Sequence, residues 1–129
     1  MTIENGQLTV KKPNAIEDKS FAFAVRVVNL YKYLCHEKKE YVISKQLLRS
    51  GTAIGALVRE AEQAESKPDF IHKMAIALKE SNETEYWVLL LAETDYLNTQ
   101  ESESIINDNK ELLKLLTSII NSTKRGMNT

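Results

Sequence analysis

The chain has 129 residues, of which 43% are hydrophobic and 27% are charged, ordinary values for a single globular domain. Its formal net charge of −1 offers no dominant basic field, which argues against a dedicated DNA-binding protein. The one cysteine, Cys35, excludes an intramolecular disulfide and a cysteine-based zinc site. There is no secretory signal pattern, and the longest apolar run, residues 87–92, is far shorter than the ~20 residues of a membrane span. We therefore expect a cytoplasmic protein without a membrane partner.

Residues 1–16 differ in pattern from the rest of the chain. Asn5-Gly6 stands between two short segments rich in Thr, Ile, Leu and Val, a combination that favours a small hairpin. Two such short strands are only marginally stable unless they dock on something. We expect a flexible or loosely docked N-terminal arm over 1–16, a helical domain over 17–123 and a disordered tail over 124–129.

The first helical pattern covers about 17–38 and contains two apolar stripes. One stripe comprises Phe21, Val25, Val28, Tyr31 and Cys35, and the other comprises Phe23, Val27, Leu30 and Leu34. Two stripes on one helix indicate neighbours on more than one side. The charged run 37–40 that follows is expected to be a solvated turn.

The second pattern covers about 42–65, and its apolar positions repeat at helical spacing. They are Ile43, Leu47, Ile54, Val58 and Ala61. Gly51 and Gly55 lie four residues apart on one face. Each glycine costs a helix roughly 1 kcal/mol relative to alanine, so we predict that another backbone approaches closely there.

The third and fourth patterns have clear boundaries. Ser66, with Pro68 and Asp69 behind it, predicts the start of a helix that continues to about residue 98. The fourth helix is expected over about 102–123, ended by the run 124–126. Four amphipathic helices with short connections predict an all-α, up-down-up-down antiparallel four-helix bundle.

Three cations share one face of the second helix: Lys45, Arg49 and Arg59. This strip could meet phosphates or the carboxylates of a partner. It could equally be a solvated face, or its arginines could pair with carboxylates inside the bundle.

Two carboxylates, Glu60 and Glu83, lie on apolar stripes. An unpaired charge at such a position is costly, so we expect both to be buried or interfacial and paired, with Arg49 or Arg59 as partner. A di-metal site would need four carboxylates and two Glu-x-x-His pairs. The chain offers only the segment 69–72 in that style, so we expect no metal and no cofactor.

No arrangement typical of a catalytic nucleophile can be argued from the two histidines, which both lie near helix ends. We expect no enzymatic activity. Tyr86 and Trp87 could stack on a base, although aromatic residues at helical spacing more often belong to a core or a subunit interface.

Several of these residues together resemble a known family. They are Gln46-Leu47, Arg49-Ser50, Ile54, Glu60-Ala61, Ser66, Asp69-Phe70 and the segment from Lys79-Glu80 to Glu83. Over about residues 17–121 the pattern resembles the four-helix bundle proteins encoded in intervening sequences of bacterial 23S rRNA genes, which carry the label S23 ribosomal protein. It is similar also to the accessory variability protein of diversity-generating retroelements. The resemblance implies a ring-like homopentamer without enzymatic activity, and, for the retroelement relatives, binding of nucleic acid and a reverse transcriptase.

Two functions remain open from the sequence. The first is a non-enzymatic oligomeric scaffold that binds structured RNA or a ribonucleoprotein through Lys45, Arg49 and Arg59. The second is a protein-interaction module that holds an enzyme partner without contacting nucleic acid.

Overall fold

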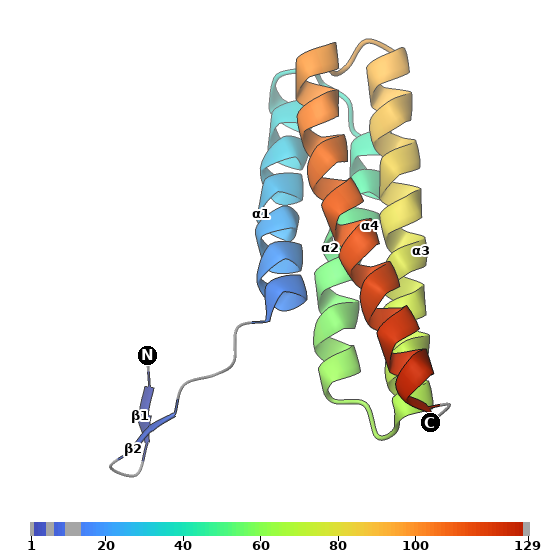
Figure 1. The fold of residues 1–129 in the computed structure, drawn as a ribbon. Helices are drawn as coiled ribbons and strands as arrows, with labels where there is room; N and C mark the ends of the chain where they lie inside the picture. The colour runs from blue at the N-terminus through green and yellow to red at the C-terminus, as the bar shows by residue number, and fades with distance from the viewer. Residues whose placement is uncertain (1, 5–6, 10–13, 128–129) are drawn as a thin grey trace.

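Four long helices form the body of the molecule. The structure, a computed structural model, describes residues 2–4, 7–9 and 14–127. The helices are α1 (Ala15–His36), α2 (Ile43–Glu62), α3 (Lys67–Glu93) and α4 (Thr99–Met127). They lie alongside one another, with the α1–α2 and α3–α4 connections at one end of the bundle and the α2–α3 connection at the other (Figure 1). The all-α class predicted from the sequence is confirmed.

A small hairpin precedes the helices. Strands β1 (Thr2–Glu4) and β2 (Gln7–Thr9) pair antiparallel, with Ile3 opposite Leu8. The predicted turn at residues 5 and 6 lies outside the described residues. The helical domain begins earlier than the predicted residue 17, because the Asn14 side chain accepts a hydrogen bond from the Glu17 amide and caps α1 at Ala15. Ile16, assigned to the arm, is buried in the core.

The core lies between the four helices and consists mainly of aliphatic side chains. The largest fully buried hydrophobic residues are Val27, Leu34, Leu47, Ile54, Val58, Met74, Val88, Leu91, Leu112 and Leu116. In α1, the stripe containing Phe23 and Val27 faces this core. The other stripe leaves Phe21 57% and Val25 46% exposed. The remaining members of that stripe, Val28, Tyr31 and Cys35, are partly buried, so its first half is the part left open to solvent.

The predicted close contact at the two glycines joins α1 to α2. A Cβ atom at Gly51 would lie 2.7 and 2.8 Å from the methyl groups of Val27, closer than real carbon atoms approach. A Cβ atom at Gly55 would lie 3.3 Å from the carbonyl oxygen of Ser20. The absence of both side chains allows the two helices to approach, which compensates for the low helix propensity of glycine.

A polar pair is buried between α3 and α4. The Ser81 hydroxyl donates to Asn109 Oδ1 at 2.7 Å, and Asn109 Nδ2 donates to the Ser81 carbonyl at 2.9 Å. Asn109 is 1% exposed, yet among the described residues every buried side-chain nitrogen and oxygen has a partner. A buried amide that is satisfied in one arrangement favours that arrangement over alternatives.

The turn between α1 and α2 differs from the prediction. Glu40 was expected in a solvated run, but it is 7% exposed, and its carboxylate accepts hydrogen bonds from the amides of Val42, Ile43 and Ser44 at 3.0, 3.0 and 2.6 Å. The N-cap position, Val42, has no side-chain acceptor of its own. Glu40 supplies it, because the first amides of a helix need an outside partner.

The ends of α3 and α4 also differ from the prediction. α3 stops at Glu93 and not near 98, because Asp95 adopts a left-handed conformation with φ 69°. The amides of Asp95 and Tyr96 then bond to the carbonyls of Ala92 and Leu91, which ends the helix in a Schellman motif without glycine.

α4 starts at Thr99, where Asn98 and Glu101 exchange side-chain to amide hydrogen bonds. It continues through Met127, so the assignment of 124–129 to a disordered tail is wrong for 124–127. Residues 128–129 lie outside the described part of the chain.

Candidate functional site

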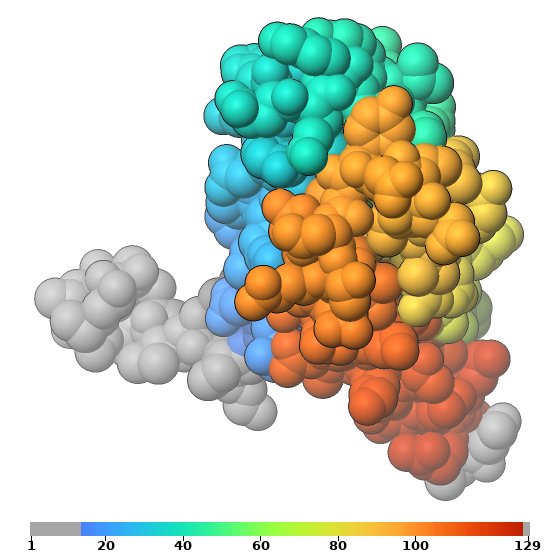
Figure 2. Space-filling model, turned by 90° about the horizontal axis from the view of Figure 1, so that it is seen from above, coloured from blue at the N-terminus to red at the C-terminus, as the bar shows by residue number. Residues whose placement is uncertain are grey.

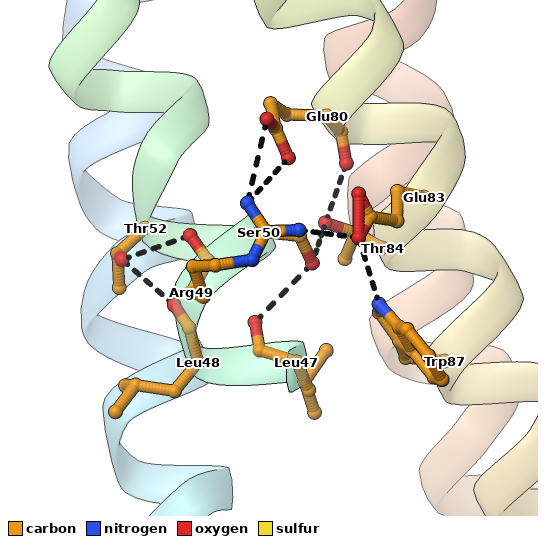
Figure 3. Close-up of polar contacts among 9 residues, drawn as sticks. All are labelled: Leu47, Leu48, Arg49, Ser50, Thr52, Glu80, Glu83, Thr84 and Trp87. Atoms are coloured by element: carbon orange, nitrogen blue, oxygen red, sulfur yellow. Dashed lines mark hydrogen bonds and ion pairs between the residues drawn. The ribbon is translucent and has the colours of Figure 1, made fainter. Parts of the chain in front are cut away.

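An ion cluster joins the outer faces of α2 and α3. Arg49 Nη1 lies 3.3 Å from Glu80 Oε1, and Arg49 Nη2 donates to Glu83 Oε1 (Figure 3). Glu80 and Glu83 are three residues apart on α3, so both carboxylates face α2. The hydrogen bond from Arg49 holds the pKa of Glu83 below its ordinary value, although partial burial opposes this. The same bond raises the pKa of Arg49.

Aromatic side chains border this cluster. Trp87 Nε1 donates to Glu83 Oε1 at 3.3 Å, and the rings of Tyr86 and Trp87 meet edge to face with centroids 5.0 Å apart (Figure 3 for Trp87). Trp87 is half-buried, whereas Tyr86 is 57% and Leu89 is 51% exposed. We call Tyr86 and Leu89 the α3 patch. Aromatic residues and arginine are enriched among the residues that dominate binding energy at protein interfaces.

Two buried hydroxyls lie beneath the ion cluster. Ser50 Oγ and Thr84 Oγ1 are 2.9 Å apart, and the Thr84 hydroxyl is also 2.8 Å from the Glu80 carbonyl (Figure 3). Both residues are fully buried. This contact joins α2 to α3 at the residues next to Arg49 and Glu83, so it holds together the two backbone segments that carry the ion cluster.

The three predicted cations do not behave alike. Arg49 forms ion pairs with Glu80 and Glu83. Arg59 lies over the ring of Phe21, with its guanidinium carbon 5.6 Å from the ring centroid. Lys45 is exposed, and the ion pairs found among the described residues do not include it. All three side chains are exposed, but Arg49 is paired with carboxylates, so Lys45 and Arg59 are the two cations of the strip without an ion pair among the described residues.

A shallow groove between α1 and α2 leads to Arg59. Its floor is made of small residues where the two helices approach, among them Ala24, Gly55 and Ala56, and Phe21 forms one wall. We call Phe21 and Val25 the α1 patch. Because Arg59 lies on Phe21, this apolar surface carries a positive charge at its edge.

The two predicted carboxylates have different surroundings. Glu83 pairs with Arg49, one of the two expected partners. Glu60 pairs instead with Lys73 at 3.1 Å, and its side chain is 54% exposed, so within the chain it is not buried. Lys73 was missed as a partner because the sequence argument considered only the arginines of the second helix.

Neither a metal-binding group nor a membrane-spanning helix is found among the described residues. Over 2–4, 7–9 and 14–127, no group of three His, Cys, Asp or Glu side chains is placed to hold a metal ion. In the same part of the chain no helix is long and apolar enough to cross a bilayer. Cys35 is half-buried, with its Sγ 3.8 Å from the Ser44 hydroxyl.

The sequence and the fold can be compared with known proteins. The family of 23S rRNA-intervening sequence proteins matches residues 12–118, most of the chain. The chain belongs to this family. A crystal structure of a protein with unknown function from the S23 ribosomal protein family of Bacteroides thetaiotaomicron is similar, with 63% sequence identity and a TM-score of 0.81. The similarity covers 81% of this chain and 97% of that one. No curated protein matches.

Both family labels agree with the resemblance inferred from the sequence. The family match begins at residue 12, after the two strands. The similarity to the crystal structure covers nearly all of that relative but a smaller share of this chain. The hairpin thus precedes the region that defines the family.

Proposed function

We propose that this up-down-up-down antiparallel bundle is the subunit of a non-enzymatic, cytoplasmic homo-oligomer that acts as a scaffold for structured RNA or a ribonucleoprotein. We propose five subunits, as the resemblance to the accessory variability protein of retroelements implies. The observation that carries the proposal is the pair of unlike apolar patches on α1 and α3.

The two patches suit each other. The α1 patch carries the cation of Arg59 at its edge. The α3 patch lies beside a cluster in which one guanidinium faces two carboxylates, Glu80 and Glu83, and which is therefore net negative. Contacts between two unlike surfaces of one chain are head-to-tail, and such contacts form a ring when the rotation closes. Burial of both patches removes apolar side chains from water, which favours association.

Light scattering tests the assembly. We expect a mass near five times 14.7 kDa for the pentamer. Val25→Glu and Leu89→Glu, one in each patch, should each shift the mass toward a single subunit. Met127→Glu is the matched control, because Met127 is also an exposed apolar residue but lies at the end of α4. A wild-type mass near 14.7 kDa at micromolar concentration contradicts the assembly.

The RNA part of the proposal is supported by the family's description and by the accessible cations Lys45 and Arg59. One subunit offers few such cations, but a ring repeats them, and linked sites gain avidity. Because phosphate contacts release counterions, the affinity should fall steeply as salt rises.

Charge reversal tests the RNA site. Lys45→Glu with Arg59→Glu should abolish binding of a structured RNA. Because Arg59 lies at the edge of the α1 patch, Arg59→Glu alone is expected to weaken assembly as well. Lys45→Glu alone changes no residue of either patch and therefore tests the RNA contact in an oligomer that still assembles. Lys110→Glu with Lys114→Glu makes the same charge change on exposed positions of α4 and should leave binding intact. Binding that survives the first double reversal in an intact oligomer would place the site elsewhere.

One observation favours the alternative function, a protein-interaction module that holds an enzyme partner. Arg49 is already paired with two carboxylates, so the surface beside Tyr86 and Trp87 is not basic. A complete lack of RNA binding at low salt, together with retention of a protein partner by the α3 patch, would support this alternative.

A further inference from the structure

The turn between α1 and α2 is flanked by lysines for which the described residues provide no ion-pair partner. Lys32, Lys38, Lys39 and Lys45 are all exposed. The ion pairs found over residues 14–127 involve none of them. Lys38 lies 6.0 Å from the centroid of the Tyr33 ring, a contact that leaves its charge available. Four exposed lysines within residues 32–45 give this segment a local positive potential, which attracts an anionic ligand.

One of the two carboxylates of the same turn is buried. Segment 32–45 contains two carboxylates, Glu37 and Glu40. Glu40 is buried and accepts three amide hydrogen bonds at the start of α2. Glu37 is the exposed one. The surface of the turn is therefore more basic than its sequence suggests.

Two large apolar side chains protrude beside the lysines. Tyr41 is 56% exposed and Val42 is 73% exposed, and both lie in the connection between α1 and α2. Neither is required for the core, which is complete without them. An exposed tyrosine ring offers a face for stacking, and exposed apolar groups of this size mark contact surfaces when they gather with others.

The rest of this end of the molecule limits where a ligand can lie. Figure 2 looks onto this end and shows the α1–α2 segment on one side and the α3–α4 connection on the other. The α3–α4 side carries exposed Glu93 and Asp95 and the half-buried Glu101. A polyanion would be repelled there, so the favourable path is confined to the side of the lysines.

We infer that the α1–α2 turn is a contact surface for an unpaired, single-stranded segment of the structured RNA, with phosphates on Lys38, Lys39 and Lys45 and an unpaired base stacked on Tyr41. This inference rests on the proposed RNA-binding function and names the strand form that is recognised. Lysines on flexible stems suit a backbone of variable path. Stacking on one exposed ring tolerates any base but requires that the base be unpaired. A duplex, whose bases are stacked internally, offers the phosphates alone.

The experiment compares a labelled single-stranded RNA of mixed sequence with the same strand annealed to its complement. Binding to the full chain is measured by fluorescence anisotropy over a series of salt concentrations. The wild type should prefer the single strand. Lys38→Glu with Lys39→Glu should weaken binding to both forms at least tenfold and flatten the salt dependence, because each lost phosphate contact lowers the slope by about 0.7 for single strands.

Substitutions at Tyr41 separate stacking from charge. Tyr41→Ala should weaken binding to the single strand roughly tenfold, within the range that one stacked base accounts for. It should leave the salt slope and the duplex affinity unchanged, and Tyr41→Phe should restore the single-strand preference. Lys110→Glu with Lys114→Glu again serves as the charge-matched control. Circular dichroism melts of each variant confirm that the bundle is folded.

The outcomes are distinguishable. If the wild type binds no RNA at low salt, the proposed function fails and this inference fails with it. If the wild type binds, but neither the Lys38–Lys39 reversal nor Tyr41→Ala weakens it more than the α4 control, the inference is overturned while the proposed function stands. Equal loss of single-strand and duplex binding on Tyr41→Ala overturns the stacking role.

Discussion

Helix α1 is held by two seams of opposite character. Against α2, it packs through a contact so close that Gly51 has no room for a side chain next to Val27. It packs much less closely against α4. There, long charged side chains form ion pairs between the two helices. Lys19 pairs with Glu111 at 3.0 Å and Arg26 with Asp108 at 2.6 Å, all of them between 42 and 54% exposed. One seam depends on shape and the other on solvated charge.

The difference between the seams shows where the stability of the bundle resides. Overpacking in a close contact typically costs about 1–3 kcal/mol, because backbones and buried side chains must move. An exposed ion pair contributes about 0.2–1 kcal/mol and is screened by salt. We therefore expect substitutions along α1–α2 to affect the free energy of unfolding strongly, and substitutions along α1–α4 to affect it weakly.

The largest effect is expected for Gly51→Leu. Its Cβ would lie 2.7 Å from a methyl group of Val27, which is itself completely buried. We expect a loss of about 3 kcal/mol or more in urea unfolding. Val27→Ala should partly rescue Gly51→Ala, because the two changes share one contact and are not additive. A double variant no more stable than the sum of the single changes predicts would contradict the contact.

A smaller loss is expected for Gly55→Leu. Here the nearest atom to a Cβ is the Ser20 carbonyl oxygen at 3.3 Å, tight but not impossible. The better helix propensity of leucine, roughly 1 kcal/mol over glycine, offsets part of the crowding. We expect a net cost of about 1–3 kcal/mol. Stability unchanged or raised would show that the α1–α2 groove opens readily at this position.

The stability of the α1–α2 connection should depend on Glu40. Glu40→Ala removes the acceptor of three amides and should cost about 1–2 kcal/mol, as the loss of a helix cap does. Burial raises the pKa of Glu40, but the hydrogen bonds from the amides of Ile43, Ser44 and Val42 outweigh it and leave the pKa below its ordinary value. The folded state therefore binds this proton less readily than the unfolded state does.

The stabilisation that Glu40 provides depends on pH. The contribution of Glu40 is fully present above the pKa of the unfolded state and is lost as the pH falls through the lowered pKa of the folded state. Thermal unfolding of wild type and Glu40→Gln across acidic pH should show curves that converge as the pH falls. Curves that remain parallel would mean that the carboxylate charge contributes nothing to the cap.

The smallest effect is expected at the solvated seam. Arg26→Ala removes the ion pair with Asp108 and two hydrogen bonds to Ser104, yet all of these groups are at or near the surface. We expect a loss below about 1 kcal/mol that shrinks further in high salt. A larger, salt-independent loss would show that the α1–α4 seam is packed like its neighbour.

The helices were predictable from the sequence because apolar residues recur at helical spacing and because Ser66 and Asp69 mark the start of α3. The Ser66 hydroxyl accepts the Asp69 amide, as expected. The glycine contact was predictable as well, since Gly51 and Gly55 would otherwise weaken α2. Periodicity alone could not show which of the two apolar stripes of α1 faces the core.

Three features were predicted wrongly from the sequence for one physical reason: the end of α3, the cap of α2 and the partner of Glu60. Asp95 ends α3 in a left-handed conformation that glycine adopts most readily. Aspartate adopts it more often than most residues do, but it also occurs within helices, so its position did not mark the helix end. Glu40 caps α2 from within a charged run that reads as solvent-exposed. Glu60 was matched to an arginine, whereas Lys73 on the next helix reaches it. Each depends on local backbone geometry or on partners from another helix, which spacing does not report.

The buried pair of Ser81 and Asn109 has a consequence for how this family can diverge. A purely aliphatic core would permit α4 to slide along α3 by a helical turn at little cost, and the loop between them would then have to fix the alignment. Here the amide fixes it from inside, since a displaced Asn109 would lose both of its hydrogen bonds to Ser81. Positions 81 and 109 should accordingly covary among relatives. Sequences with two polar partners or two aliphatic ones are expected, and a lone asparagine facing an aliphatic residue should be selected against.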